Sequence, residues 1–181
     1  NSDTELLLSE DESTFNITAV NIEENSRKVP VNYVLPPDIN REINIGTTNL
    51  QQLNEQSLGL QVCDLEDGRA KAAYRNLDYD IRSYRKLKMF VHGEAAGDQT
   101  LNDGDLRVFI RLGTDFDENY YEYEIPLRVT PAGSYSAESE DQQRLVWPDA
   151  NRIEIEFDTL RSAKARRNQI ESSATAESIL N

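Results

Sequence analysis

The sequence DLRVFIRLGTDFDENYYEYEIPL, residues 105–127, decides the fold class of this chain. Apolar side chains recur at every second position in both halves of the stretch, at Leu106, Val108, Ile110, Leu112, Tyr121, Tyr123, Ile125 and Leu127. Apolar positions that alternate with charged or aromatic ones are typical of antiparallel strands with one buried face. The polar segment DFDEN between the halves predicts a turn, so the stretch as a whole predicts a β-hairpin.

The same alternation continues outward from this hairpin. It predicts strands at residues 13–22, 58–63, 87–92 and 153–157, with residues 70–74 as the hairpin partner of the second. Two stacked sheets bury so many single apolar faces most economically. We therefore predict an all-β fold, a two-sheet antiparallel β-sandwich of jelly-roll order. Outside the strands, residues 130–150 predict a long surface loop, and residues 160–170 predict a short C-terminal helix.

The length of 181 residues suits one core rather than two. The domain division predicted from composition has three parts. Residues 1–12 form an acidic flexible lead-in, residues 13–170 a single β-sandwich domain, and residues 171–181 a flexible tail.

The balance of 19 basic against 33 acidic residues gives a net charge of −14. Such a chain repels polyanions, so nucleic-acid binding is not expected. No apolar run approaches the roughly 20 residues that a membrane helix needs. We expect a fragment of a larger protein that is not itself inserted in a membrane.

Cys63 and His92 are the only residues of their kinds. A single thiol excludes an intramolecular disulfide and a multi-cysteine zinc site. His92 has no nucleophile motif and no second histidine beside it, so we expect no catalytic residues and no enzyme activity.

The predicted turn between the two halves of the hairpin offers oxygen ligands at alternating positions, Asp115, Asp117 and Asn119. Carboxylate and amide oxygens are the ligands that Ca²⁺ prefers, so a structural Ca²⁺ is the candidate cofactor. The loop is not an EF-hand, because Tyr120 stands where glycine is required and Pro126 where glutamate is required. The alternative is a plain polar turn, and no other cofactor is expected.

The candidate binding surface consists of side chains between the buried positions of the strands. If residues 87–92, 106–112 and 120–127 share one sheet, its second face carries Phe90, His92, Phe109, Arg111 and Tyr120. Aromatic rings with charged groups between them suit a glycan or a protein partner. In the alternative interpretation, the rings pack under a loop and the charges form cross-strand pairs.

Four segments resemble a known family when taken together. They are VNYVLPPDINREI at 31–43, NEQSLGLQVCDLEDGRAKAAYRNLDYDIRSYRKLKMFVHGE at 54–94, DLRVFIRLGTDFDENYYEYEIPL at 105–127, and WPDANRIEIEFDTLRSAKARRN at 147–168. The set resembles the gliding-motility cell-surface protein SprA family of Bacteroidetes, called Sov in non-gliding relatives. None of the four segments is a catalytic motif.

This resemblance implies a domain of a very large outer-membrane protein, the translocon of the type IX secretion system, which supports gliding motility. The domain would be non-enzymatic and would face the periplasm or the cell surface. Its partners would be other parts of the translocon and associated secretion or cargo proteins. The strand order is also similar to galactose-binding-like jelly rolls of carbohydrate-binding modules. The alternative function is therefore glycan recognition on an aromatic sheet face.

Overall fold

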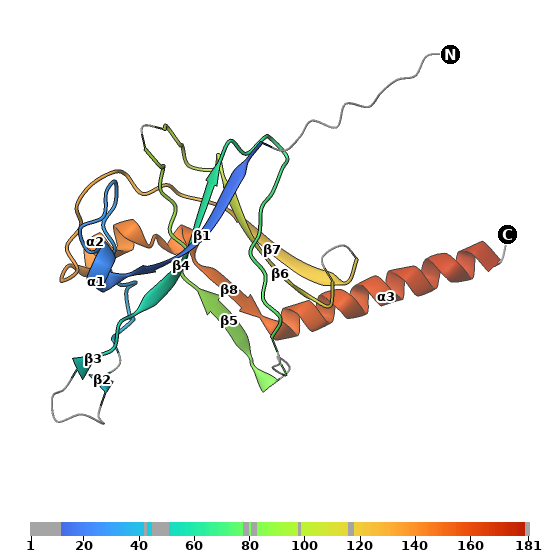
Figure 1. Cartoon of the computed structure of the whole chain (residues 1–181). Helices are drawn as coiled ribbons and strands as arrows, with labels where there is room; N and C mark the ends of the chain where they lie inside the picture. The colour runs from blue at the N-terminus through green and yellow to red at the C-terminus, as the bar shows by residue number, and fades with distance from the viewer. Residues whose placement is uncertain are drawn as a thin grey trace, which may run out of the picture. The chain divides into compact units, whose positions relative to one another are not determined.

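The computed structural model describes residues 12–41, 43–44, 51–77, 80, 83–97, 99–115 and 118–179 (Figure 1). The backbone divides into two compact units. Unit 1 comprises Asn1–Ser26 and Arg41–Asp78, and unit 2 comprises Arg27–Asn40 and Tyr79–Asn181. The described part is strand-rich, with four antiparallel two-stranded sheets, and this confirms the predicted antiparallel strands. The stacking of these pairs into a sandwich of jelly-roll order stays a prediction.

Unit 1 is built on a long antiparallel ribbon. Its strands are β1 (Thr14–Asn21) and β4 (Gln56–Cys63), and Ile17 lies opposite Leu60. The short strands β2 (Ile43–Asn44) and β3 (Gln51–Gln52) form a second pair.

The helix α1 (Ile22–Asn25) begins directly after β1 because Asn21 caps it. The side-chain oxygen of Asn21 accepts a hydrogen bond from the backbone N–H of Glu24 at 2.9 Å. Such a bond satisfies a backbone donor that the first helical turn leaves without a partner.

The predicted pairing of residues 70–74 with β4 is wrong. The turn before this segment is present, since the backbone N–H of Arg69 donates to the carbonyl of Glu66 at 3.0 Å and Gly68 has a φ of 77°. Residues 70–74, however, form no strand. β4 pairs instead with β1, whose eight residues match it along its whole length. A turn therefore forms without a hairpin.

The described residues of unit 2 form two antiparallel strand pairs and three helices. The first pair is β5 (Lys86–Met89) with β8 (Ile153–Glu156), and the second is β6 (Arg107–Gly113) with β7 (Tyr120–Pro126). The helices are α2 (Glu140–Val146), the 3-10 helix Asp149–Asn151, and α3 (Phe157–Ile179). The predicted hairpin over residues 105–127 is confirmed as β6 and β7.

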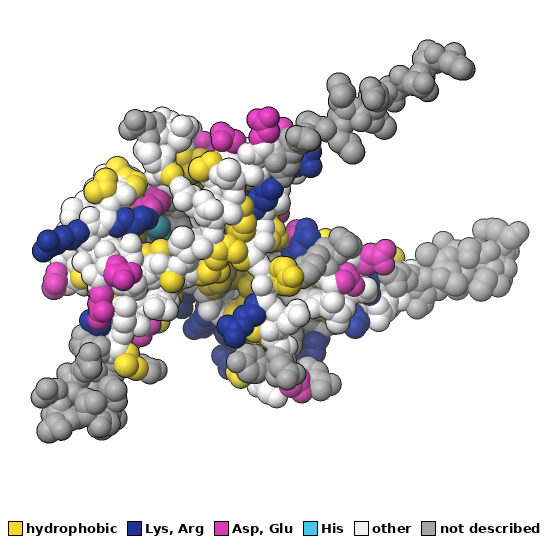
Figure 2. Space-filling view, in the orientation of Figure 1, with side chains coloured by type: hydrophobic (Ala, Val, Ile, Leu, Met, Phe, Trp, Pro, Cys, Tyr) yellow, Lys and Arg dark blue, Asp and Glu magenta, His cyan; other side chains and the backbone are white. Residues whose placement is uncertain are grey.

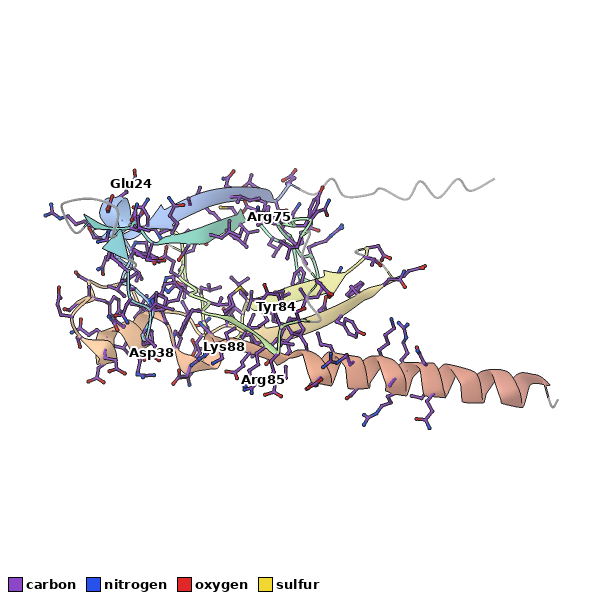
Figure 3. All side chains as sticks on the ribbon, turned by 90° about the horizontal axis from the view of Figure 1, so that it is seen from below. Glu24, Asp38, Arg75, Tyr84, Arg85 and Lys88 are labelled. Carbon is purple, nitrogen blue, oxygen red and sulfur yellow. The ribbon has the colours of Figure 1, made fainter. Side chains whose placement is uncertain are left out.

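β5 and β8 separate an apolar face from a charged one. Leu87 and Met89 lie opposite the buried Ile155 and Ile153. The other face carries ion pairs from Lys86, whose Nζ lies 3.0 Å from Glu156 Oε1 and also contacts Glu154. Figure 3 labels Lys88 on β5 and Arg85 just before it; both side chains are exposed.

The core of unit 2 forms around Trp147. Its indole N–H donates to the carbonyl of Val34 at 2.8 Å, and its ring meets Tyr33 edge to face at 6.1 Å between centroids. Val146 and Ile153 are also buried. The segment around residues 31–34, which is neither helix nor long strand, therefore packs as part of this core.

The predicted C-terminal helix is confirmed in place. α3 begins at Phe157 and continues to Ile179, so the expected boundary between residues 170 and 171 falls inside the helix (Figure 1). The predicted loop over residues 130–150 contains a further helix, α2, that the sequence interpretation missed. The division into a lead-in, one domain and a tail stays a prediction.

Candidate functional site

Three of the five predicted binding residues lie together on the hairpin of β6 and β7. Phe109, Arg111 and Tyr120 share one face, which we call the β6–β7 aromatic face. The Arg111 guanidinium carbon lies 4.3 Å from the Tyr120 ring centroid and 5.3 Å from that of Phe109. These distances fall within the range of cation–π attraction.

Ion pairs between the two strands lie on this face of the hairpin. Arg111 lies directly opposite Glu122, and its Nε donates to a Glu122 carboxylate oxygen at 2.6 Å. Arg107 forms a diagonal ion pair with Glu124, which lies opposite Phe109. The alternative interpretation, that charges form cross-strand pairs, therefore describes part of this face. Because Arg111 already covers a face of each ring, stacking of a sugar on them is not favoured.

A glycine closes the turn end of the same hairpin. A Cβ added at Gly113 would lie 2.2 Å from the backbone oxygen of Asn119 and 2.5 Å from the Cα of Tyr120. These distances are far below any real contact, so only glycine lets the two strands approach at this point. The position of Tyr120 on the aromatic face depends on that close approach.

Phe90 and His92 do not join this face. The assumption that residues 87–92 share a sheet with the hairpin is wrong, because β5 pairs with β8 and ends at Met89. Both rings pack instead against Trp147, with centroids 6.5 Å and 5.7 Å from its ring. The guanidinium carbon of Arg152 lies 5.2 Å from the Phe90 centroid. The predicted set therefore falls into two groups.

His92 belongs to a partly buried polar group that we call the His92 cluster, which also contains Lys28, Glu94 and Thr130. The histidine Nδ1 lies 2.9 Å from the carbonyl oxygen of Val146 and 3.2 Å from the Thr130 hydroxyl, and its Nε2 lies 3.3 Å from a Glu94 oxygen. Glu94 also forms an ion pair with Lys28. Figure 2 shows the histidine, in cyan, at the surface among side chains of both charges.

The electrostatics of the His92 cluster favour an ionised Glu94. Partial burial raises the pKa of the Glu94 carboxyl group, but hydrogen bonds with His92 and Lys28 outweigh this effect. The pKa of Glu94 therefore lies below its ordinary value.

A hydroxyl, an imidazole and a carboxylate in sequence have the composition of a hydrolytic triad. Here, however, Thr130 is only 3% exposed and its hydroxyl donates to backbone carbonyls of residues 145 and 146. A nucleophile must reach its substrate, and this hydroxyl does not face solvent. The arrangement connects the segment around His92 to the end of α2, which is a structural role.

Two of the predicted calcium ligands, Asp115 and Asn119, hydrogen-bond to each other. Asp115 Oδ1 accepts hydrogen bonds from the backbone N–H groups of Glu118 and Asn119 at 2.7 and 2.9 Å. The Asn119 amide donates to the other Asp115 oxygen at 2.6 Å. Asp117 lies outside the described residues. Within the described ranges, no group of three or more histidine, cysteine or acidic side chains is placed to hold a metal ion.

The residues that sequence reasoning missed are those of the Trp147 core and of α2. A signal for α2 was present, since Ser139 and Gln142 have the spacing of a capping box. The Ser139 hydroxyl accepts from the Gln142 backbone N–H at 3.4 Å, and Arg144 pairs with Glu140 one turn away. For Trp147 no local signal existed, because its partners come from distant parts of the chain.

The described residues thus form a strand-rich protein in which aromatic rings pack against one another and against arginine side chains. The family model SprA_N, described as motility related/secretion protein, matches residues 2–179. The chain therefore belongs to this motility- and secretion-related family, as the sequence resemblance indicated, and the family is not one of enzymes. No curated protein matches the chain. Over the described residues, no helix has both the length and the apolar character needed to cross a membrane.

Proposed function

We propose that this chain is a non-enzymatic interaction domain of an outer-membrane protein translocon that supports type IX secretion and gliding motility. The observation that carries the proposal is the family match over residues 2–179, nearly the whole chain. The domain faces the periplasm or the cell surface and contacts other parts of the translocon, associated secretion components or cargo.

The surface chemistry supports a binding role rather than a reaction. The only histidine lies in a cluster whose hydroxyl group is buried, and the β6–β7 aromatic face combines two half-buried rings with exposed charged side chains. Tyrosine, phenylalanine and arginine are enriched at protein–protein interfaces, so this combination of side chains suits contact with another protein. The family match gives no support to the carbohydrate-binding alternative. We retain the jelly-roll sandwich as the proposed arrangement of the strand pairs.

Secretion by cells that carry a variant parent gene tests this function. Deletion of residues 30–170 should abolish export of type IX cargo, and Arg111→Ala with Tyr120→Ala should reduce it several-fold. Arg161→Ala, on the exposed helix α3, is the matched control and should secrete normally. The abundance of the parent protein in the envelope is measured in parallel to exclude simple loss of the translocon. Normal secretion and gliding in the deletion strain would overturn the proposal.

A structural Ca²⁺ at Asp115, Asp117 and Asn119 stays a prediction with its own test. A cation held by these oxygens would relieve carboxylate repulsion in a chain of charge −14. It would also stabilise the folded state by mass action, by about 2.7 kcal/mol at a free concentration one hundred times its Kd. Thermal melts in millimolar Ca²⁺ and in chelator should then differ by several degrees in midpoint. Equal midpoints would assign the loop to a plain polar turn.

A further inference from the structure

The ribbon of β1 and β4 differs in chemistry from the rest of the chain. Its sixteen residues, TFNITAVN and QSLGLQVC, contain no charged residue and no proline, whereas 29% of the whole chain is charged. We call this pair of strands the uncharged ribbon. A surface without charge over this length does not arise from the average composition of the chain, so it calls for a specific explanation.

One face of the uncharged ribbon is apolar and open to solvent. The register places six apolar side chains on this face, three from each strand, at Phe15, Ile17, Ala19, Leu58, Leu60 and Val62. Ile17 is 54% exposed, Leu58 65% and Leu60 50%. Scattered exposed leucines need no explanation, but six apolar residues on one face form a contiguous patch typical of a binding surface.

Among the described strands, both strands of the ribbon are edge strands. In the described part of the chain, β1 and β4 pair only with each other. Proteins normally protect such edges with lysine, proline or a bulge, because unpaired backbone groups otherwise accept a further strand. Neither strand carries a lysine or a proline, so the edges are suited to pairing with another strand.

Acidic residues flank the ribbon at both ends. Because Thr14 lies opposite Cys63, Glu12 and Asp64 lie beyond one end of the ribbon. Because Asn21 lies opposite Gln56, Glu23 and Glu55 lie beyond the other end, where Glu23 also forms an ion pair with Arg41 at 3.1 Å. An apolar centre with a charged rim is the usual anatomy of a protein interface. The charge of the rim disfavours a second copy of this chain, whose net charge is also −14.

From these features we infer that the uncharged ribbon binds a β-strand of a partner protein, apolar on one face and flanked by Lys or Arg at both ends. The strand adds to an edge of the ribbon and extends its apolar face, as in β-strand addition. Its apolar part covers the eight paired residues, about 27 Å at roughly 3.4 Å per residue. Its basic ends lie against the acidic rim. This inference does not depend on which secretion machinery the chain serves.

A labelled peptide tests the inference with the full chain. The probe is Lys-Lys-(Thr-Val)₄-Lys-Lys carrying a fluorophore, and its anisotropy is titrated with protein. We expect saturable binding that weakens at least tenfold in the double variant Leu58→Thr, Leu60→Thr, which keeps β-favouring residues at exposed positions. The matched control is Leu145→Gln on α2, where the leucine is 57% exposed, and it should bind as the native chain does.

Peptide controls separate the two parts of the recognition. A peptide with glutamate in place of lysine should bind much more weakly, and added salt should weaken binding of the lysine probe. Absence of binding, equal binding of both peptides, or full binding by the double variant would overturn the inference. A concentration-dependent dimer that the double variant abolishes would also overturn it, by assigning the face to a second copy. Maleimide labelling tests whether another part of the chain covers the apolar face of the ribbon. In a Cys63→Ser background, much slower labelling of Leu60→Cys than of Leu145→Cys would show such cover and would overturn the inference.

Discussion

Replacement of Trp147 with alanine is expected to lower the free energy of unfolding of unit 2 by about 3–5 kcal/mol, the usual cost of deleting a buried large aromatic side chain. Trp147 is 7% exposed, and its ring packs against Tyr33, Phe90 and His92. The substitution also leaves the Val34 carbonyl without the indole N–H that donates to it at 2.8 Å. Urea denaturation followed by far-ultraviolet circular dichroism measures the loss.

Trp147→Phe separates the loss of the hydrogen bond from the loss of ring packing, and Leu145→Ala serves as the control. Trp147→Phe keeps much of the ring packing but removes the hydrogen bond, so it should cost less than Trp147→Ala. Leu145→Ala, on the exposed side of α2, should change the free energy of unfolding by less than about 1 kcal/mol. A loss below 1 kcal/mol for Trp147→Ala would contradict the role of Trp147 as the centre of the core.

The location of most strands could be predicted from the sequence because alternation of side chains is a local property. β6 and β7 lie within the predicted hairpin, and β1, β4 and β8 lie within or close to predicted strands. Each strand carries its period of two in its own residues. The choice of partner strand is not local, and there the prediction failed.

β4 illustrates the difference. The turn at Gly68 gave a local reason to pair it with residues 70–74, but β1, about forty residues earlier in the sequence, supplies eight consecutive partners. The longer pairing forms more backbone hydrogen bonds and brings apolar side chains into contact across the strands. Nothing in a strand's own alternation identifies which distant strand will meet it.

The candidate site was predictable to the same extent. Phe109, Arg111 and Tyr120 come together because a short turn joins their strands, so neighbours in sequence become neighbours across the hairpin. The positions of Phe90 and His92 were not predictable, because both rings pack against Trp147, which lies more than fifty residues away in the sequence. The sequence therefore predicted the part of the face that one hairpin builds, and missed the contacts that bring distant segments together.

Asn151 shows how much of unit 2 depends on a polar side chain that no pattern singled out. It is fully buried, and its side chain makes two hydrogen bonds with one residue of the backbone. Its Oδ1 accepts from the N–H of Arg128 at 2.7 Å, and its Nδ2 donates to the Arg128 carbonyl at 2.8 Å. The Asn151 side chain thus makes the two hydrogen bonds to the Arg128 backbone that a neighbouring strand would otherwise make after the end of β7.

We expect Asn151→Ala to destabilise unit 2 by about 2–4 kcal/mol, because it removes a fully buried side chain and leaves the partly buried N–H and carbonyl of Arg128 without their partner. The matched control is Asp149→Asn in the same 3-10 helix, whose side chain is 70% exposed and should have little effect. Amide hydrogen exchange gives a local readout, since the Arg128 N–H should exchange much faster in Asn151→Ala than in the native chain. If stability falls while the Arg128 amide stays protected, the cost is that of the cavity left by the side chain, and the hydrogen bonds are not its cause.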